Sequence, residues 1–377
     1  MDFLPTILGT RPRLAVEVRA EGVVAARAED AAAMLAAVVR TGLPDGALAP
    51  GLKPGNIVDK DAVVEAVRKA LDGVAGTGRE RSRDVTLVVP DSAVRVLFLD
   101  FDQLPSKRAE ALPVVRFRLK KLLPFDADDA MVSYQVMSGT KGGGVIKMVA
   151  VAIPKEVLSE YEGVVLAAGY LPGAVLPSTL AALAGLEETE APVLVVNAAP
   201  SAVTTAIVQA GALLLHRSVD MSGDFGAEAA PETRVAAMVA MALVDRESSA
   251  QEWAQQEALG PEGWSRFDAE VAMQTAVVEA AELRERASVA AAHEVTQAVS
   301  VAVAYFEDTL RTVPEAVLAA GTLGAETLDA MMVESGFEGL RVREMVDSGM
   351  IEPGAASATM AGMSKGWLAG VRGALKS

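Results

Sequence analysis

The stretch Val-Thr-Leu-Val-Val-Pro at residues 85–90 decides the fold class of this chain. An apolar run of this length that ends at a proline is typical of a strand buried on both faces of a parallel sheet, and such sheets occur in α/β folds. The sequence that follows predicts further elements in the order β-α-β-β-α-β. These are a strand over 94–101, a helix over 106–122, strands over 131–136 and 145–153, a helix over 155–168 and a strand over 173–176.

The segments on either side of this stretch suggest two similar halves. On its N-terminal side, residues 13–19 and 23–28 flank a short turn with Gly22, which predicts a β-hairpin. Asp59 then precedes apolar residues at helical spacing, so we expect a capped amphipathic helix. On the C-terminal side, a helix over 178–186 and the acidic link 187–190 lead into a second set of strands over 193–197, 202–209 and 213–219. A weak internal repeat of this kind predicts a duplicated architecture.

The rest of the chain completes the second half. Residues 231–306 are helical in pattern, a strand over 316–318 ends at Gly321, and helices follow over 325–333 and 356–375. We expect the last helix to pack in the core, although its apolar and basic residues also fit an amphipathic helix at a membrane surface. The predicted domains are a first half over 1–190, with an inserted ferredoxin-like subdomain over about 94–176, and a second half over 191–377, with a helical subdomain over about 220–312.

Composition excludes several classes of function. The chain has 377 residues, a net charge of −16, no cysteine and only two histidines. The negative charge repels phosphate backbones, so nucleic acid is not the expected partner. Without cysteine there is no disulfide, thiolate metal site or thiol nucleophile, and two distant histidines make a Ser-His-Asp triad improbable. No apolar run is long enough for a membrane span and no signal peptide is visible, so we expect a cytoplasmic protein.

Four short motifs follow one another in the first half of the chain. They are Val88-Val89-Pro90, Leu123-Pro124-Phe125-Asp126, Ser133-Tyr134-Gln135-Val136 and Ala168-Gly169-Tyr170-Leu171-Pro172. With these motifs in this order, the chain resembles the type IV pilus assembly protein PilM family over nearly its whole length. The resemblance implies an actin-like (ribonuclease H-like) two-half α/β fold with an inserted ferredoxin-like α+β subdomain. The cytoplasmic platform protein of type II secretion and the divisome protein FtsA are related to this family.

The resemblance also implies three nucleotide-binding loops, and each departs from the family pattern in this chain. The first loop should contain Asp-x-Gly, but here Glu17 and Arg19 occupy those places. The second should repeat that pattern, but here Asn197 stands first and Thr204 follows further on. The third should be a Gly-Gly-Gly turn, of which only Gly321 and Gly324 remain. Because glycines let backbone N–H groups approach phosphate and an aspartate positions metal-bound water, we expect ATP binding to be weak or lost, with no metal site and no catalytic residue.

Two enzymatic alternatives stay open at this point. In an active ATPase, Glu17 would stand in for the aspartate and Arg19 would neutralise phosphate charge. A carbohydrate kinase of the same superfamily would need intact phosphate loops beside a catalytic aspartate, and those loops are absent here. We therefore favour a scaffold over an enzyme.

The resemblance further implies the partners of such a scaffold. The cytoplasmic N-terminal peptide of a single-span, PilN-like membrane protein would lie in a groove beside the inserted subdomain. The chain would then couple pilus motor ATPases to an inner-membrane assembly platform. It would be peripheral to that membrane, and a homo-oligomer or ring is one form it could take. One basic cluster in the inserted subdomain could meet an acidic partner or anionic lipid, or could simply be a solvated helix face. It comprises Arg116, Arg118, Lys120 and Lys121.

Overall fold

The computed structural model describes residues 12–76, 83–138, 145–221, 292–337, 339–355 and 363–376. One unit of the chain comprises Met1–Asp220 and Val295–Ser377, and a second unit spans Met221–Glu294. Only Met221 and residues 292–294 of the second unit are described, so most of the helical subdomain expected over 220–312 lies outside the described residues. In the described part of that range, residues 292–305 are helical and the π-helical turn Phe306–Leu310 follows.

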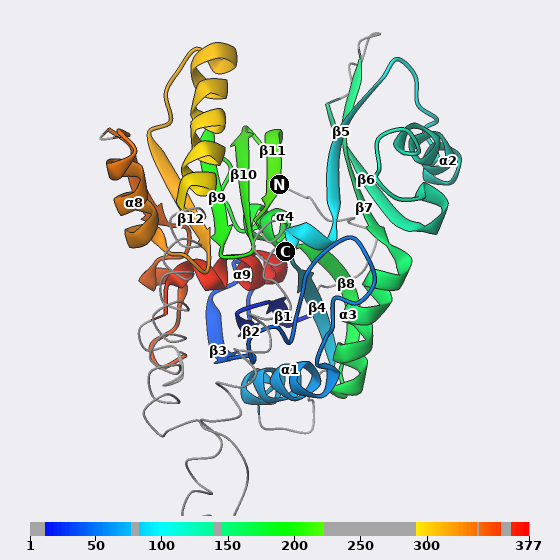
Figure 1. Cartoon of the computed structure of the whole chain (residues 1–377), viewed down its shortest axis with the longest axis vertical. Helices are drawn as coiled ribbons and strands as arrows, with labels where there is room; N and C mark the ends of the chain where they lie inside the picture. The colour runs from blue at the N-terminus through cyan, green and yellow to red at the C-terminus, as the bar shows by residue number, and fades with distance from the viewer. Residues whose placement is uncertain are drawn as a thin grey trace, which may run out of the picture. The chain divides into compact units, whose positions relative to one another are not determined.

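The first half is built on a five-stranded sheet with the order β3-β2-β1-β4-β8 (Figure 1). Strands β1, β2 and β3 run antiparallel to one another, whereas β1, β4 and β8 are parallel. All of β4 after its first residue is buried, as expected for the stretch at 85–90. The strands are β1 (Leu14–Arg19), β2 (Gly22–Ala28), β3 (Leu35–Thr41), β4 (Asp84–Val89) and β8 (Leu171–Pro177).

The second half repeats this sheet with the order β11-β10-β9-β12-β13. Again the first three strands in sequence form an antiparallel meander, and the last two are parallel to the first of them. Two copies of this strand order make the actin-like fold that the resemblance implies, so the expected fold class is confirmed. The strands are β9 (Val193–Ala199), β10 (Ala202–Gln209), β11 (Ala212–Asp220), β12 (Ala316–Gly321) and β13 (Arg341–Glu344).

Helices α1 (Lys60–Val74) and α3 (Lys155–Ala167) cover one face of the first sheet. Helix α1 begins where the sequence predicts, because the side chain of Asp59 accepts a hydrogen bond of 3.0 Å from the backbone N–H of Ala62. A cap of this kind is worth about 1 kcal/mol. The apolar side of α1 packs on β1 and β2 around valines and alanines, which is why a chain with only 4% aromatic residues can still fill this core.

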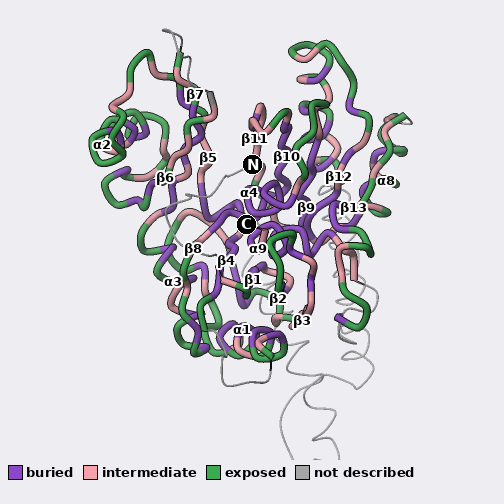
Figure 2. The backbone as a smooth tube through the Cα atoms, turned by 180° about the vertical axis from the view of Figure 1, so that it is seen from behind, coloured by how far each residue is buried: buried purple, intermediate pink, exposed green. Residues whose placement is uncertain are grey.

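The short helices α4 (Ser178–Ala184) and α9 (Ala369–Leu375) lie between the two sheets. Their buried side chains join those of both sheets in a single apolar cluster, which includes Val88 from the first half and Val195 from the second. In Figure 2 this central layer is buried almost throughout. The last helix therefore packs in the core, although it begins later than the sequence suggests. A 3-10 turn (Lys365–Leu368) precedes it, and residues 356–362 lie outside the described residues.

The inserted subdomain is smaller than expected. Its antiparallel sheet has three strands in the order β5-β7-β6, covered on one face by α2 (Arg108–Leu119). The strands are β5 (Arg95–Phe101), β6 (Ala130–Ser138) and β7 (Ile146–Pro154). The strand and helix expected to complete a ferredoxin-like unit are present as β8 and α3, but both belong to the first half. Strand β8 belongs to the sheet of the first half because it pairs in parallel with β4, which is buried after its first residue.

Two strands and a helix complete the described fold. Strands β3 and β13 are absent from the sequence-based prediction, and each lies at the edge of its sheet. Helix α8 (Ala325–Glu334) follows β12 as expected and packs on β13. Among the described residues, no helix is both long and apolar enough to cross a bilayer.

Candidate functional site

The candidate site lies at the carboxyl end of β1, where two charged residues point into the space between the sheets. Side chains alternate along a strand, so Val16 and Val18 face α1 while Glu17 and Arg19 face α4 and α9. Both charged side chains are almost completely buried, and they form an ion pair of 2.6 Å between Arg19 Nη2 and Glu17 Oε1. Burial of this degree requires that their polar atoms find partners inside the protein.

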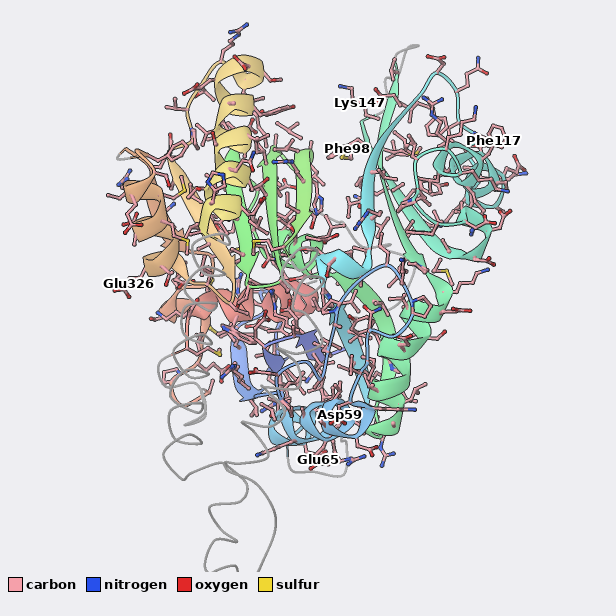
Figure 3. All side chains as sticks on the ribbon, viewed as in Figure 1. Asp59, Glu65, Phe98, Phe117, Lys147 and Glu326 are labelled. Carbon is pink, nitrogen blue, oxygen red and sulfur yellow. The ribbon has the colours of Figure 1, made fainter. Side chains whose placement is uncertain are left out.

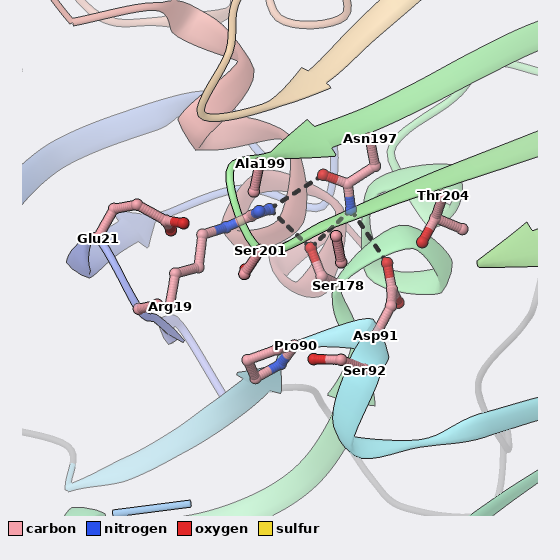
Figure 4. Close-up of a pocket in the computed structure, with 12 residues that line it drawn as sticks. Arg19, Glu21, Pro90, Asp91, Ser92, Ser178, Asn197, Ala199, Ser201 and Thr204 are labelled. Atoms are coloured by element: carbon pink, nitrogen blue, oxygen red, sulfur yellow. Dashed lines mark hydrogen bonds between the residues drawn. The ribbon is translucent and has the colours of Figure 1, made fainter. Parts of the chain in front are cut away.

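Those partners come from both halves of the molecule. The hydroxyl of Ser178, at the start of α4, donates to Glu17 Oε1 at 2.6 Å and accepts from Arg19 Nη2 at 2.7 Å. Arg19 Nη2 also donates to Asn197 Oδ1 at 3.3 Å, at the carboxyl end of β9. Figure 4 shows the guanidinium of Arg19 directed at Ser178 and Asn197. One side chain of the first half thus reaches the first strand of the second half.

Asp91 and Thr179 extend this network. The amide nitrogen of Asn197 donates to Asp91 Oδ2 at 3.2 Å, to Ser178 Oγ at 2.9 Å and to Thr179 Oγ1 at 2.9 Å. Thr179 in turn donates to Asp91 through both its backbone N–H and its hydroxyl. We call these six residues the cleft network. Its members are Glu17, Arg19, Asp91, Ser178, Thr179 and Asn197, and all of them are buried.

Burial also sets the protonation of the groups in this region. Removal of water raises the pKa of Glu17 above its usual 4.5, although Arg19 and the hydrogen bond from Ser178 act in the opposite direction. Burial lowers the pKa of His216 on β11, which favours its neutral form despite the nearby carboxylate of Asp91. Glu17 Oε2 has no hydrogen-bond partner among the described residues and lies against the backbone of α9 at Gly370. Any side chain at Gly370 would collide with this oxygen.

The two β-turns nearest the network leave little room for a ligand. Only two residues connect β1 to β2, and only two connect β9 to β10. Around Arg19, Asp91 and Asn197, the cavity leaves about 20 Å³ for the centres of water-sized molecules. That is about what a single water requires. The side chain of Arg19 lines this cavity and donates to Ser178 and Asn197 across it.

The other residues expected at nucleotide loops are only partly brought to this site. Thr204 lines the cavity, and its hydroxyl bonds to Ser218 at 3.0 Å. Gly321 ends β12 with φ of 87° directly against Asn197 and the backbone of Ala198, where a side chain would not fit. Gly324 lies apart from the cavity: it precedes α8 and packs against Ser364.

The fold family implies Mg-ATP, and the residues present do not fit that ligand. Glu17 Oε1 is bound to Arg19 and Ser178, and Glu17 Oε2 is buried against Gly370. Asp91 accepts hydrogen bonds from Thr179 and Asn197, so both carboxylates already face protein groups on the side of the cavity. Among the residues that the structure describes, no group of three or more carboxylates or histidines could hold a metal ion. What this arrangement does chemically is to join the two halves through buried hydrogen bonds and one ion pair.

The sequence predicted Glu17, Arg19 and Asn197 at this site, and the structure brings these three together. It did not single out Asp91, Ser178 or Thr179. A usable signal was present, since Asp91 follows β4 and Ser178 follows β8, both parallel strands of one sheet. The carboxyl ends of parallel strands lie along one edge, where ligands of α/β folds bind.

The basic cluster of the inserted subdomain lies on α2 and is not a single surface. Arg116 is partly buried and donates to the backbone oxygens of Ala127 and Ala130. Lys120 pairs with Asp128, and this pairing raises the pKa of Lys120. Arg118 and Lys121 are exposed. Two of the four residues therefore hold the subdomain together, and two are available to a partner.

Comparisons with known proteins bear on the fold. No family model matches the sequence, and no curated protein sequence matches it. A chain of the PilM–PilN type IV pilus biogenesis complex matches the structure with a TM-score of 0.66 and 17% identity, over 97% of this chain and 100% of that one. The chain shares the fold of that pilus protein. The resemblance to PilM seen in the sequence is therefore confirmed in the structure.

Two further solved structures match less well. The cytoplasmic domain of EpsL, from the type II secretion system of Vibrio cholerae, gives a TM-score of 0.36 and 13% identity over 65% of this chain and 78% of that one. The ethanolamine utilization protein EutJ from Carboxydothermus hydrogenoformans gives 0.42 and 12% identity over 97% of this chain and 89% of that one.

Proposed function

We propose that this chain is a cytoplasmic, actin-like scaffold of a type IV pilus or related type II secretion platform, and that it works without bound nucleotide. Its partner would be the cytoplasmic N-terminal peptide of a PilN-like single-span membrane protein, which places the chain at the inner face of that membrane. The support for the pilus context is the likeness to a chain of the PilM–PilN complex over the whole length of both. Motor ATPases and further copies of the chain are additional expected partners.

The observation that carries the nucleotide-free part of the proposal is the ion pair of Arg19 with Glu17. In an actin-like ATPase the ligand between the halves holds them together through phosphate and metal contacts. Here a protein cation, Arg19, lies between the halves and contacts Ser178 of the first half and Asn197 of the second. Because Arg19 is fixed by three partners, expelling it would leave the buried carboxylate of Glu17 without its counter-charge. The cleft network thus takes over the joining role of the nucleotide.

The experiment is a calorimetric titration of the purified full chain. Mg-ATP is titrated into the protein alone, and the peptide of the PilN-like protein from the same organism is titrated with and without Mg-ATP. We expect no heat from Mg-ATP and the same peptide affinity in both conditions. Micromolar binding of Mg-ATP would overturn the nucleotide-free scaffold in favour of the active ATPase. Failure of the peptide to bind would overturn the pilus assignment and leave the statement about the cleft intact.

A further inference from the structure

The outward face of α2 combines exposed apolar and basic side chains. The helix buries Ala111, Val115 and Leu119 in the subdomain core. On the opposite side Phe117 is 69% exposed, more than any other large hydrophobic residue that the structure describes. One exposed hydrophobic side chain is ordinary, but several that lie together mark an interaction site.

Further exposed residues lie near Phe117 at the end of α2. Val114 precedes it by three positions, one helical turn back, and Arg118 is the next residue along the helix. Lys121 and Leu122 lie in the turn that follows α2. Val114 is 38% exposed and Leu122 50%. We call these five residues the α2 face: it presents three apolar side chains and two long basic ones on the last turns of α2 and the turn after it.

The two basic residues of the α2 face are electrostatically available. Among the described residues, neither Arg118 nor Lys121 makes a side-chain hydrogen bond or ion pair. Of the nearby carboxylates, Glu110 pairs with Lys107 and Asp128 pairs with Lys120. The α2 face itself thus carries two basic side chains and no acidic one, on a chain whose net charge is −16.

The position of α2 limits what can cover this face. The sheet of β5, β6 and β7 lies between α2 and β11, so the helix is on the side of the subdomain that is turned away from the second half (Figure 1). Phe117 points outward from that side, whereas Phe98 lies on the opposite side of the sheet (Figure 3). Among the described residues, no strand or helix lies over the α2 face.

We propose that the α2 face docks on an anionic lipid bilayer. An apolar stripe with an aromatic residue at its centre and flanking Arg and Lys side chains suits the membrane interface: the ring enters the acyl boundary while the basic heads reach lipid phosphates. A peptide partner would instead call for a groove with side-chain pockets. Charge complementarity favours the anionic lipid, because Arg118 and Lys121 have no acidic partner among the described residues and can offset locally the repulsion between such a surface and this acidic chain. The inference rests on α2 alone and does not depend on the pilus assignment.

The test is sedimentation of the full chain with vesicles of phosphatidylcholine alone or with an equal part of phosphatidylglycerol. We expect binding to the anionic vesicles only, weakened by salt. The variants Phe117→Ser and Arg118→Glu/Lys121→Glu should each reduce the affinity roughly tenfold or more. Because these side chains are exposed, the variants should unfold at the temperature of the unmodified chain, which a thermal melt checks.

Matched controls change the same chemistry elsewhere. Lys60→Glu/Lys69→Glu on α1 alters net charge equally, and Val58→Ser removes another exposed apolar side chain. Both controls should bind anionic vesicles like the unmodified chain. Absence of vesicle binding, or an equal loss in the controls, would overturn the proposal. If the chain bound no vesicles, a protein would be the remaining kind of partner for the α2 face.

Discussion

At the scale of single residues, Glu17 and Arg19 stabilise the fold only as a pair. Both side chains are buried away from water. The attraction between their opposite charges, across the 2.6 Å between Arg19 Nη2 and Glu17 Oε1, offsets much of the free-energy cost of that burial. Replacing either one leaves a buried charge with hydrogen bonds but no counter-charge. Replacing both with uncharged residues of similar size removes the desolvation cost together with the attraction.

We therefore predict that Glu17→Gln and Arg19→Met each lower the free energy of unfolding by about 3–5 kcal/mol, whereas the double variant recovers most of that loss. Urea denaturation of the three variants and the unmodified chain measures this. The pair Arg68→Met and Glu65→Gln, an exposed i,i+3 ion pair on α1, is the control and should change stability by less than about 1 kcal/mol. Additive losses in the double variant at the cleft would contradict the prediction.

How much of this site the sequence reveals depends on where each residue's partners lie. Glu17, Arg19 and Asn197 could be picked out because they stand where the PilM resemblance expects nucleotide loops. Asp91 and Ser178 have their partners 106 and 161 residues away in sequence, so no local pattern marks them. Their role follows only once the parallel strands are known to end at one edge. That Arg19 is a buried cation bound to Glu17, Ser178 and Asn197 likewise follows only from the distances between their atoms in the structure.

At the scale of elements, helices α4 and α9 approach each other more closely than side chains would allow. Gly373 of α9 lies against the backbone of Ala181 and of Gly185, and a methyl group at position 373 would overlap the carbonyl oxygen of Ala181. Arg372 and Lys376 then donate to the carbonyl oxygen of Gly185 just beyond α4, where the helix dipole favours positive charge. The glycine lets the backbones meet, and the basic residues fix the end of α4.

We predict that Gly373→Ala lowers the free energy of unfolding by at least about 1–3 kcal/mol, because the backbones of α4 and α9 must move apart to make room for the methyl group. The control is Gly163→Ala in α3, where the added methyl group meets nothing within 4 Å. That change should raise stability by about 0.5–1 kcal/mol through helix propensity alone. Thermal unfolding of the two variants distinguishes the effects, and an increase in stability for Gly373→Ala would contradict the close approach of α4 and α9.

The elements themselves were predictable where their sequence pattern is strong. Buried strands such as β4 and capped helices such as α1 were expected at nearly their observed positions. The edge strands β3 and β13 were not. The apolar run that opens β3 is rich in alanine and does not alternate, so it fits a helix as well as a strand, and β13 has only four residues. Strand β8 was expected but grouped with the inserted subdomain, since periodicity does not say which sheet a strand joins.

At the scale of the whole chain, the halves of the described unit are also connected at the inserted subdomain, apart from the cleft network and the apolar cluster of α4 and α9. Arg95 of β5 in the inserted subdomain forms an ion pair of 3.2 Å with Asp220 at the end of β11. Both side chains are partly exposed, so this pair contributes little to the free energy of unfolding. The distance between the two residues is nevertheless a measure of the separation between the inserted subdomain and the second half. The chain contains no cysteine, and a pair of engineered cysteines would therefore be the only thiols present.

We predict that Arg95→Cys/Asp220→Cys is cross-linked by a short bismaleimide at the same rate with and without Mg-ATP, since the cleft network holds the halves without a ligand. Adding Glu17→Gln/Arg19→Met should slow the reaction, because the link from β1 to Asn197 is then lost. Lys107→Cys/Glu110→Cys within α2 is the control for reagent efficiency and should respond to neither change. If Mg-ATP altered the rate for the first pair but not for the control, the halves would be moving with nucleotide, and the cleft network could not be what sets their separation.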